Sequence, residues 1–142
     1  MGGRLRIREF QLDADYERVY EIWQRAEVPI RPSDSKAEVA KKLQRDPELF
    51  LVAERDGLIL GAVMGAWDGR RGWVYHLAVH PDFRRQRIGT ALMSELEKRL
   101  RAKGCLKVNL LVHVDNLAAR RLYDRLGYEA IKGYIPVGKE LQ

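Results

Sequence analysis

Residues 77–90, LAVHPDFRRQRIGT, form the stretch that decides the fold of this chain. It runs from an apolar, strand-like segment through three arginines into a glycine and an apolar-periodic segment that follows. A helix N-terminus leaves several backbone N–H groups unpaired and has a partial positive charge. Glycine there lets another molecule approach the backbone closely. The stretch therefore predicts a strand, a loop and a helix start that together bind a phosphate or pyrophosphate.

The three arginines of this loop, Arg84, Arg85 and Arg87, allow two interpretations. One is a solvated basic turn, and the other is a set of positive charges around a bound anion. A cation at a helix N-terminus is slightly unfavourable for the helix dipole. Three of them in one such loop therefore favour the bound anion.

Outward from this stretch, hydrophobic periodicity and turn signals predict the order β-α-α-β-β-β-α-β-α-β. Strands are predicted at residues 4–10, 48–54, 58–67, 73–80, 106–114 and 128–139. Helices are predicted from a cap at Asp13 to Ala26, from a capping box at Ser35 to Asp46, and at 88–103 and 116–126. An antiparallel meander followed by a β-α-β crossover predicts an α/β fold, a mixed sheet with helices on its faces.

Composition sets the class of protein. At 142 residues the chain is expected to form one domain, 1–142, with its own core. The single cysteine, Cys105, excludes an internal disulfide framework, and the histidines show no metal-ligand spacing, so no metal is expected. No apolar run reaches the length of a signal peptide or membrane span, which predicts a soluble cytoplasmic protein. The net charge of +6 fits either phosphate-bearing partners or solvated helix faces.

A second motif lies at residues 115–129, DNLAARRLYDRLGYE. Together with LAVHPDFRRQRIG, the pattern N-x-x-A-x-x-L-Y-x-x-L-G-Y resembles the GNAT superfamily of acetyl-CoA-dependent N-acetyltransferases. The stretches at 64–72 and 75–84 resemble MGxxDGxRG and YxLxVHPxFR of an uncharacterised bacterial subgroup. The resemblance implies a sheet splayed between the fourth and fifth strands. It also implies acetyl transfer from acetyl-CoA to a primary amine of a small molecule or protein, by direct attack.

The resemblance also implies which residues bind the coenzyme. Leu77, Ala78 and Val79 match the strand whose backbone holds the pantetheine arm. The pyrophosphate loop matches Arg84, Arg85, Gln86, Arg87, Ile88, Gly89 and Thr90. Arg87 departs from the pattern Q/R-x-x-G-x-G/A, since it replaces the first glycine. We expect its amide to remain usable if its φ is negative.

Two further positions, Asn116 and Tyr123, match the asparagine near the pantetheine and the tyrosine beside the acetyl-CoA sulfur. A phenol at that place can protonate the leaving thiolate, although helix spacing also allows a core role for Tyr123. The amide of Leu77 is the expected oxyanion donor.

The sequence does not identify the general base. Some GNAT enzymes have a glutamate on the fifth strand, and the matching residue here is Leu111. The alternatives are Tyr75, His76, Asn109, His113 or a water-mediated route. Strand alternation places Tyr75, Leu77 and Val79 on one face and His76 on the other. We therefore favour His76 as a structural histidine under a helix.

The acceptor pocket of this fold is expected between the first two helices and the meander. The residues expected there are Trp23, Arg31, Trp67, Asp68 and Tyr75. Few acidic residues lie in these segments, which favours a small amine that has its own negative charge over a polyamine. A homodimer is compatible with such a fold, and no membrane partner is expected.

Two other functions compete with acetyl transfer. The basic composition allows a nucleic-acid-binding domain, although the chain has no aromatic-bearing RNA motif, zinc spacing or helix-turn-helix pattern. A GNAT-type protein could also bind acyl-CoA as a sensor without turning it over, an alternative that the retained Tyr123 opposes.

Overall fold

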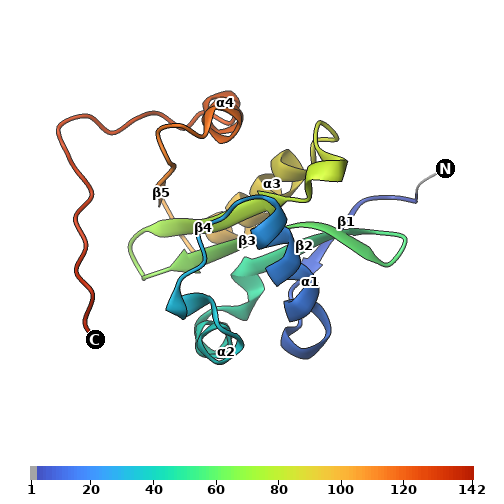
Figure 1. Ribbon diagram of the computed structural model, residues 1–142. Coiled ribbons are helices and arrows are strands. Elements are labelled where there is room, and N and C mark those ends of the chain that lie inside the picture. Colours follow the sequence, from blue (N-terminus) through green and yellow to red (C-terminus); the bar gives the residue numbers. More distant parts are fainter. Residues whose placement is uncertain (1–2) are drawn as a thin grey trace. The chain divides into compact units, whose positions relative to one another are not determined.

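The computed structural model describes residues 3–142, which fall into two compact units that divide between Leu111 and Val112. Figure 1 labels its helices and strands. In chain order the elements are β1 (Arg6–Glu9), α1 (Leu12–Arg25), the 3₁₀ turn η1 (Pro32–Asp34), α2 (Lys36–Arg45), η2 (Pro47–Leu49), β2 (Phe50–Arg55), β3 (Leu58–Trp67), β4 (Gly72–Val79), η3 (Pro81–Phe83), α3 (Ile88–Ala102), β5 (Val108–Leu110) and α4 (Leu117–Arg125). None of the helices in residues 3–142 is long and apolar enough to cross a membrane. That residues 1–142 act as a single domain stays a prediction.

The first unit contains one sheet with the strand order β1-β2-β3-β4-β5. The first four strands form an antiparallel meander, and β5 lies parallel to β4. The β4–β5 pairing covers only Gly72–Val74 against Val108–Leu110. Beyond Val74 the two strands separate, which confirms the splay that the resemblance implied.

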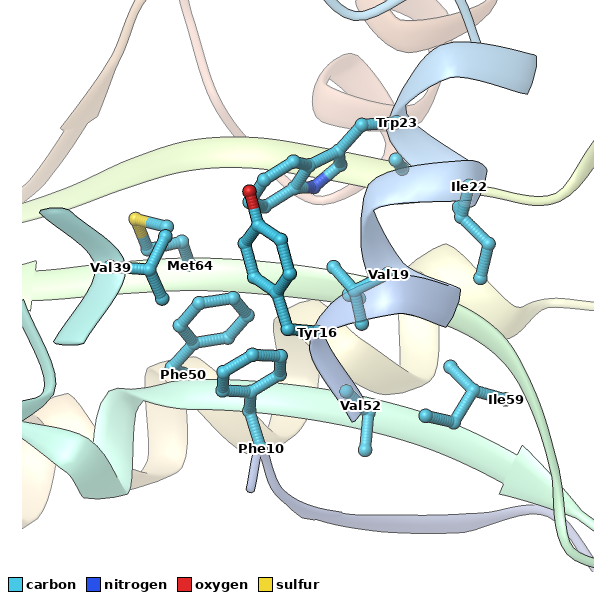
Figure 2. Packing of buried hydrophobic residues seen from close by; sticks show 12 residues of the cluster. Phe10, Tyr16, Val19, Ile22, Trp23, Val39, Phe50, Val52, Ile59 and Met64 are labelled. Carbon is cyan, nitrogen blue, oxygen red and sulfur yellow. The ribbon is translucent and has the colours of Figure 1, made fainter. Parts of the chain in front are cut away.

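A hydrophobic core fills the space between the sheet and α1, and Figure 2 shows its side chains. Helix α1 supplies Val19, Ile22 and Trp23, and α2 adds Val39 to the same cluster. Helix α1 therefore covers this face of the sheet together with α2. The other members of the core are Phe10, Tyr16, Phe50, Val52, Ile59, Ala62, Met64 and Ala78.

Helix α3 packs on the opposite face, where the sheet presents glycines. A Cβ on Gly61 would lie 2.9 Å from the Ala78 carbonyl oxygen and 3.1 Å from Ile88. A Cβ on Gly72 would lie 2.9 Å from Leu100. The absence of side chains lets α3 lie close to β3 and β4, with its leucines filling the space above them.

Most element boundaries follow the predicted signals. Ser35 caps α2, accepting a hydrogen bond from the Glu38 amide at 3.2 Å. The β2–β3 hairpin turns at Asp56 and Gly57, both with positive φ. The cap predicted at Asp13 is wrong, because α1 begins at Leu12 and Asp13 lies inside its first turn. The Asp15 carboxylate of the same turn accepts the Gln11 amide at 2.7 Å.

The last predicted strand, at residues 128–139, is also wrong. No strand follows α4 in the described chain, and the strand predicted at 106–114 shortens to Val108–Leu110. The unit Val112–Gln142 contains no other strand that could pair with such a segment. Apolar side chains of the tail, including Ile135 and Val137, are accordingly exposed.

Candidate active site

A β-bulge interrupts β4 at His76 and Leu77. The ladder with β3 pairs Ala62 with Ala78 but Met64 with Tyr75, so two β4 residues face one β3 residue. His76 has a φ of 37°, a left-handed conformation that is uncommon for a non-glycine residue. The bulge rotates the backbone at the point where β5 has left the sheet.

This bulge changes which side chains share a face. Tyr75 pairs with Met64 and Ala78 pairs with Ala62, and both partners belong to the core beneath α1. His76 also faces this side, because its ring packs against Trp23. The prediction that Tyr75, Leu77 and Val79 share one face is therefore wrong, since an extra residue breaks the period of two.

The edge of β4 that β5 leaves has free backbone groups. The His80 amide donates to the Leu60 carbonyl of β3 at 2.8 Å. Alternation along β4 then directs the amides of Leu77 and Val79 away from β3, toward the open edge. The Arg84 Nε donates to the Val79 carbonyl at 3.1 Å, consistent with this direction. Such an edge can pair with an extended ligand that contains amides.

The loop between β4 and α3 brings the arginines to the helix start. Arg84, Arg85, Gln86 and Arg87 are exposed, and the Gln86 side chain accepts a hydrogen bond from Arg55 at 2.8 Å. Helix α3 has no side-chain cap and no acidic residue in its first turn. Its first amides are therefore available to an anion. In this turn Ile88 and Gly89 are buried and Thr90 is half-buried.

Arg87 immediately precedes α3 and has φ 62° and ψ 23°. This is the left-handed region that glycine occupies without cost. The condition of a negative φ, on which we made the use of the Arg87 amide depend, is therefore not met. The loop retains the backbone shape of a glycine at this position, although the residue is arginine.

A buried carboxylate lies beside the bulge. Asp34 of η1 is 3% exposed, and its Oδ1 lies 2.7 Å from Nε2 of His76. Its Oδ2 accepts the Arg31 amide at 2.9 Å, and its carbonyl accepts the Tyr16 hydroxyl at 2.7 Å. Sequence reasoning missed this pair, because 42 residues separate its members and no local motif links them.

The predicted acceptor residues divide between two places in the first unit. Arg31 lines an open cavity of about 350 Å³ whose other lining residues are Tyr16, Glu17, Tyr20, Ile30, Pro32, Ser35 and Lys36. Trp23 is fully buried, so it supports the His76 ring, at 5.0 Å between centroids, and exposes no surface to a ligand. Trp67, Asp68 and Tyr75 do not line this cavity.

The remaining predicted acceptor residues, Trp67, Asp68 and Tyr75, lie at the end of β3 and on β4. The Asp68 carboxylate accepts the amides of Arg70 and Arg71 at 2.7 Å, and these bonds lower its pKa. The Trp67 amide donates to buried Asp46 at 3.0 Å. Tyr75 is half exposed, and burial of its hydroxyl raises its pKa. Tyr75 is the one of these three residues that lies on β4.

The second unit contains the remaining motif residues. The Asn116 side chain caps α4 by accepting the Ala119 amide at 3.1 Å. Tyr123 is buried, and its ring packs edge-on to Tyr128 at 5.6 Å. Burial raises the pKa of Tyr123 to about 12. A phenol with that pKa stays protonated at neutral pH and can donate a hydrogen bond.

The fifth-strand candidates for the general base, and His113 after that strand, are poorly suited to accept a proton from the amine. Asn109 has no titratable group, and Leu111 is an exposed apolar residue. His113 is exposed, and its Nδ1 accepts the Asp115 amide at 3.2 Å. Among residues 3–142, no group of three or more His, Cys, Asp or Glu residues is arranged to hold a metal ion.

A mixed sheet splayed at β4, with a bulge at the splay and an uncapped, arginine-rich start to the next helix, defines an acetyltransferase of the GNAT type. Residues 16–128 match the family described as the acetyltransferase (GNAT) family, and the chain belongs to it. An acetyltransferase of Pectobacterium atrosepticum is 47% identical over 138 residues, 96% of each chain. An uncharacterised N-acetyltransferase of Yersinia pestis is 46% identical over 138 residues, again 96% of each chain.

Solved structures agree with this assignment. Ard1 from Thermoplasma volcanium is 31% identical, with a TM-score of 0.79 over 87% of this chain and 81% of that one. The PaiA N-acetyltransferase of Thermoplasma acidophilum, solved with coenzyme A, has a TM-score of 0.79 over 89% of this chain and 90% of that one. At 22% identity, the second likeness shows the shared fold alone.

Proposed function

We propose that this GNAT acetyltransferase uses acetyl-CoA as its co-substrate and acetylates a primary amine by direct attack in a ternary complex. The observation that supports this most directly is the arrangement in the first unit, where an uncapped helix start follows the open edge of β4. An anion at the helix start and an amide-containing arm along the edge match the two chemical parts of coenzyme A.

In this proposal the amides of the first turn of α3 bind the pyrophosphate, with Arg84 and Arg85 adding charge. Gly89 lets the pyrophosphate approach the backbone, because a side chain there would occupy the same space. The Arg87 side chain and the Thr90 hydroxyl serve the ribose 3′-phosphate. Within the matched stretch Leu77, Ala78 and Val79, the backbone of Leu77 and Val79 holds the pantetheine arm, because it is directed toward the open edge whereas Ala78 pairs with Ala62.

The chemistry needs a donor for the oxyanion and a donor for the leaving sulfur. We assign the first role to the Leu77 amide, which alternation along β4 directs toward the open edge. We assign the second to Tyr123, whose phenol matches the motif tyrosine and keeps its proton at neutral pH. No covalent enzyme intermediate is expected, since the Cys105 thiol donates to the Lys107 carbonyl at 3.3 Å and matches no motif residue.

The cavity beside α1 favours an acceptor amine that has its own anionic group. Among the described residues, the Arg31 guanidinium has no carboxylate partner, whereas Lys36 pairs with Asp13 at 3.2 Å. Glu17 has the one carboxylate among the lining residues. We propose a small anionic amine as the acceptor and a cytoplasmic location for the reaction.

The test is release of free thiol from acetyl-CoA in the presence of single amines. A suitable panel contains glutamate, phosphoserine, O-phosphoethanolamine, spermidine and a peptide with a free N-terminus. We expect turnover with the anionic small amines and less with spermidine, and Arg31→Gln should raise KM for the anionic amines alone. Faster acetylation of spermidine would contradict the acceptor class, and binding of acetyl-CoA without turnover of any amine would favour a sensor.

A further inference from the structure

In the Asp34–His76 pair, one imidazole nitrogen contacts the carboxylate and the other nitrogen stays open. An ionised carboxylate only accepts hydrogen bonds, so with Asp34 ionised and the imidazole neutral, the 2.7 Å contact requires the ring proton to be on Nε2. The other nitrogen, Nδ1, then has a free lone pair. It has no hydrogen-bond partner among residues 3–142, and the His76 side chain is 21% exposed.

The other two histidines use the corresponding nitrogen locally. Nδ1 of His80 accepts the Asp82 amide at 3.1 Å, and Nδ1 of His113 accepts the Asp115 amide at 3.2 Å. His80 is also nearly fully buried. Of the three histidines, only His76 combines a buried carboxylate on one nitrogen with an open lone pair on the other.

The surrounding residues fix the orientation of this ring. Trp23 packs edge-on against it, and Trp23 itself is fully buried in the core. The Tyr16 hydroxyl and the Arg31 amide hold Asp34 in place, and both residues line the cavity proposed for the acceptor. The positive φ of His76 is backbone strain of the kind that proteins retain at functional positions.

We propose that His76 is the general base of the reaction and that Asp34 is its positioning residue. This inference rests on the proposed function. The neighbouring residue in the bulge is Leu77, whose amide is assigned to the oxyanion, so the base and the oxyanion donor come from adjacent residues of β4.

The proton balance of the step is complete. The lone pair of a neutral amine forms the C–N bond to the thioester carbonyl carbon, and the nitrogen then transfers one proton to Nδ1 of His76. The C–S bond breaks with its electron pair on sulfur, and the sulfur gains one proton from the donor assigned above. His76 then returns its proton to water and Tyr123 regains one from water, so the enzyme is restored and the products are the acetamide and free coenzyme A.

The first test needs no acceptor. Long-range ¹H–¹⁵N NMR spectra of the ¹⁵N-labelled wild-type protein report the tautomer of each histidine. We expect His76 as the Nε2–H tautomer with an unprotonated Nδ1, and we expect Asp34→Asn to change that pattern. A proton on Nδ1, or a His76 ring that is cationic at the pH of the assay, would overturn the proposal.

The second test is kinetic and uses the panel amine that the wild type acetylates fastest. His76→Gln should lower kcat by about 10²- to 10⁴-fold, the usual contribution of a general base, with KM for acetyl-CoA unchanged. Asp34→Asn should lower kcat less and leave both KM values near those of wild type. His113→Gln is the matched control and should keep wild-type kcat.

The double variant Asp34→Asn/His76→Gln shows whether a low kcat comes from unfolding or from loss of the base. It replaces the Asp34–His76 pair with a hydrogen bond between two neutral side chains. It should give a wild-type circular dichroism spectrum and the low kcat of His76→Gln. Wild-type kcat in a folded His76→Gln protein would exclude the base. A wild type that acetylates no amine would instead count against the proposed function. The NMR measurement of the His76 tautomer would still test the Asp34–His76 pair.

Discussion

At the scale of single residues, Arg87 departs from the family motif in its side chain but keeps the backbone conformation of glycine. The pattern of the family has glycine at this position, and the chain keeps a glycine-like φ of 62° there. A non-glycine residue in this region costs on the order of 1–3 kcal/mol, part of which glycine would recover. The sequence could reveal the departure but not the sign of φ, which depends on how the loop enters α3.

We therefore expect Arg87→Gly to stabilise the protein by about 1 kcal/mol in urea unfolding. Lys98→Gly is the matched control, because Lys98 is exposed inside α3 and glycine there should cost about 1 kcal/mol. Equal destabilisation by both variants would show that the Arg87 side chain holds the loop.

Tyr123 is the second residue whose role can be measured alone. Tyr123→Phe should lower kcat by about 10- to 100-fold, since a hydrogen bond to a charged group contributes roughly 1.5–3 kcal/mol. The Kd for acetyl-CoA, measured by calorimetry, should stay close to that of wild type. Parallel loss of kcat and affinity would point to a packing role beside Tyr128.

The raised pKa of Tyr123 also predicts a pH dependence of stability. Its folded pKa of about 12 exceeds the ordinary value of 10.0, so the unfolded chain loses this proton first as pH rises. The burial of the neutral phenol therefore stabilises the fold fully below pH 10, and up to roughly 2–3 kcal/mol is lost as pH rises toward 12. Urea unfolding of wild type and Tyr123→Phe between pH 9 and 12 checks this, and equal slopes would contradict it.

At the scale of elements, the sequence predicted helices and turns better than it predicted strand detail. The capping residue Ser35, the hairpin at Asp56 and Gly57 and the start of α3 are local signals, and the structure confirms them. The bulge at His76 has no local signal, because it depends on the register with β3. The strand predicted at 128–139 lacks a strand partner in its own unit.

The same dependence applies to the candidate site. The loop from Arg84 to Thr90 is contiguous, so a motif could locate it. The pair of Asp34 and His76 forms only when η1 packs against β4, and no spacing in one sequence predicts that contact.

The packing of α3 on β3 gives a test at this scale. A Cβ at Gly65 would clash with the Leu96 side chain and lie 3.1 Å from the Leu49 carbonyl oxygen. Gly65→Ala should therefore destabilise the protein by about 1–3 kcal/mol in urea unfolding. Gly138→Ala, where a Cβ would meet nothing within 4 Å, should change stability by less than about 0.5 kcal/mol. Equal effects would mean that α3 does not lie this close to the sheet.

At the scale of the whole molecule, the net charge is +6, and three of the arginines lie in the loop before α3. The proposed function explains this local cluster of positive charge. Attraction between these arginines and a phosphate-bearing ligand weakens as salt screens it. A nucleic-acid-binding protein would show the same salt dependence, so charge alone does not separate the two functions. Dependence on the backbone of α3 does separate them, because a side chain at Gly89 would displace a closely bound pyrophosphate but not a nucleic acid held by the exposed arginines.

The most direct test of the account is a calorimetric titration of the full chain with acetyl-CoA in low-salt buffer, for wild type, Gly89→Val and the control Gly138→Val. The account predicts micromolar binding by wild type and the control, and a loss of at least tenfold in affinity for a folded Gly89→Val protein. Absence of binding by wild type, or equal affinity of all three proteins, would contradict the claim that the start of α3 binds the coenzyme.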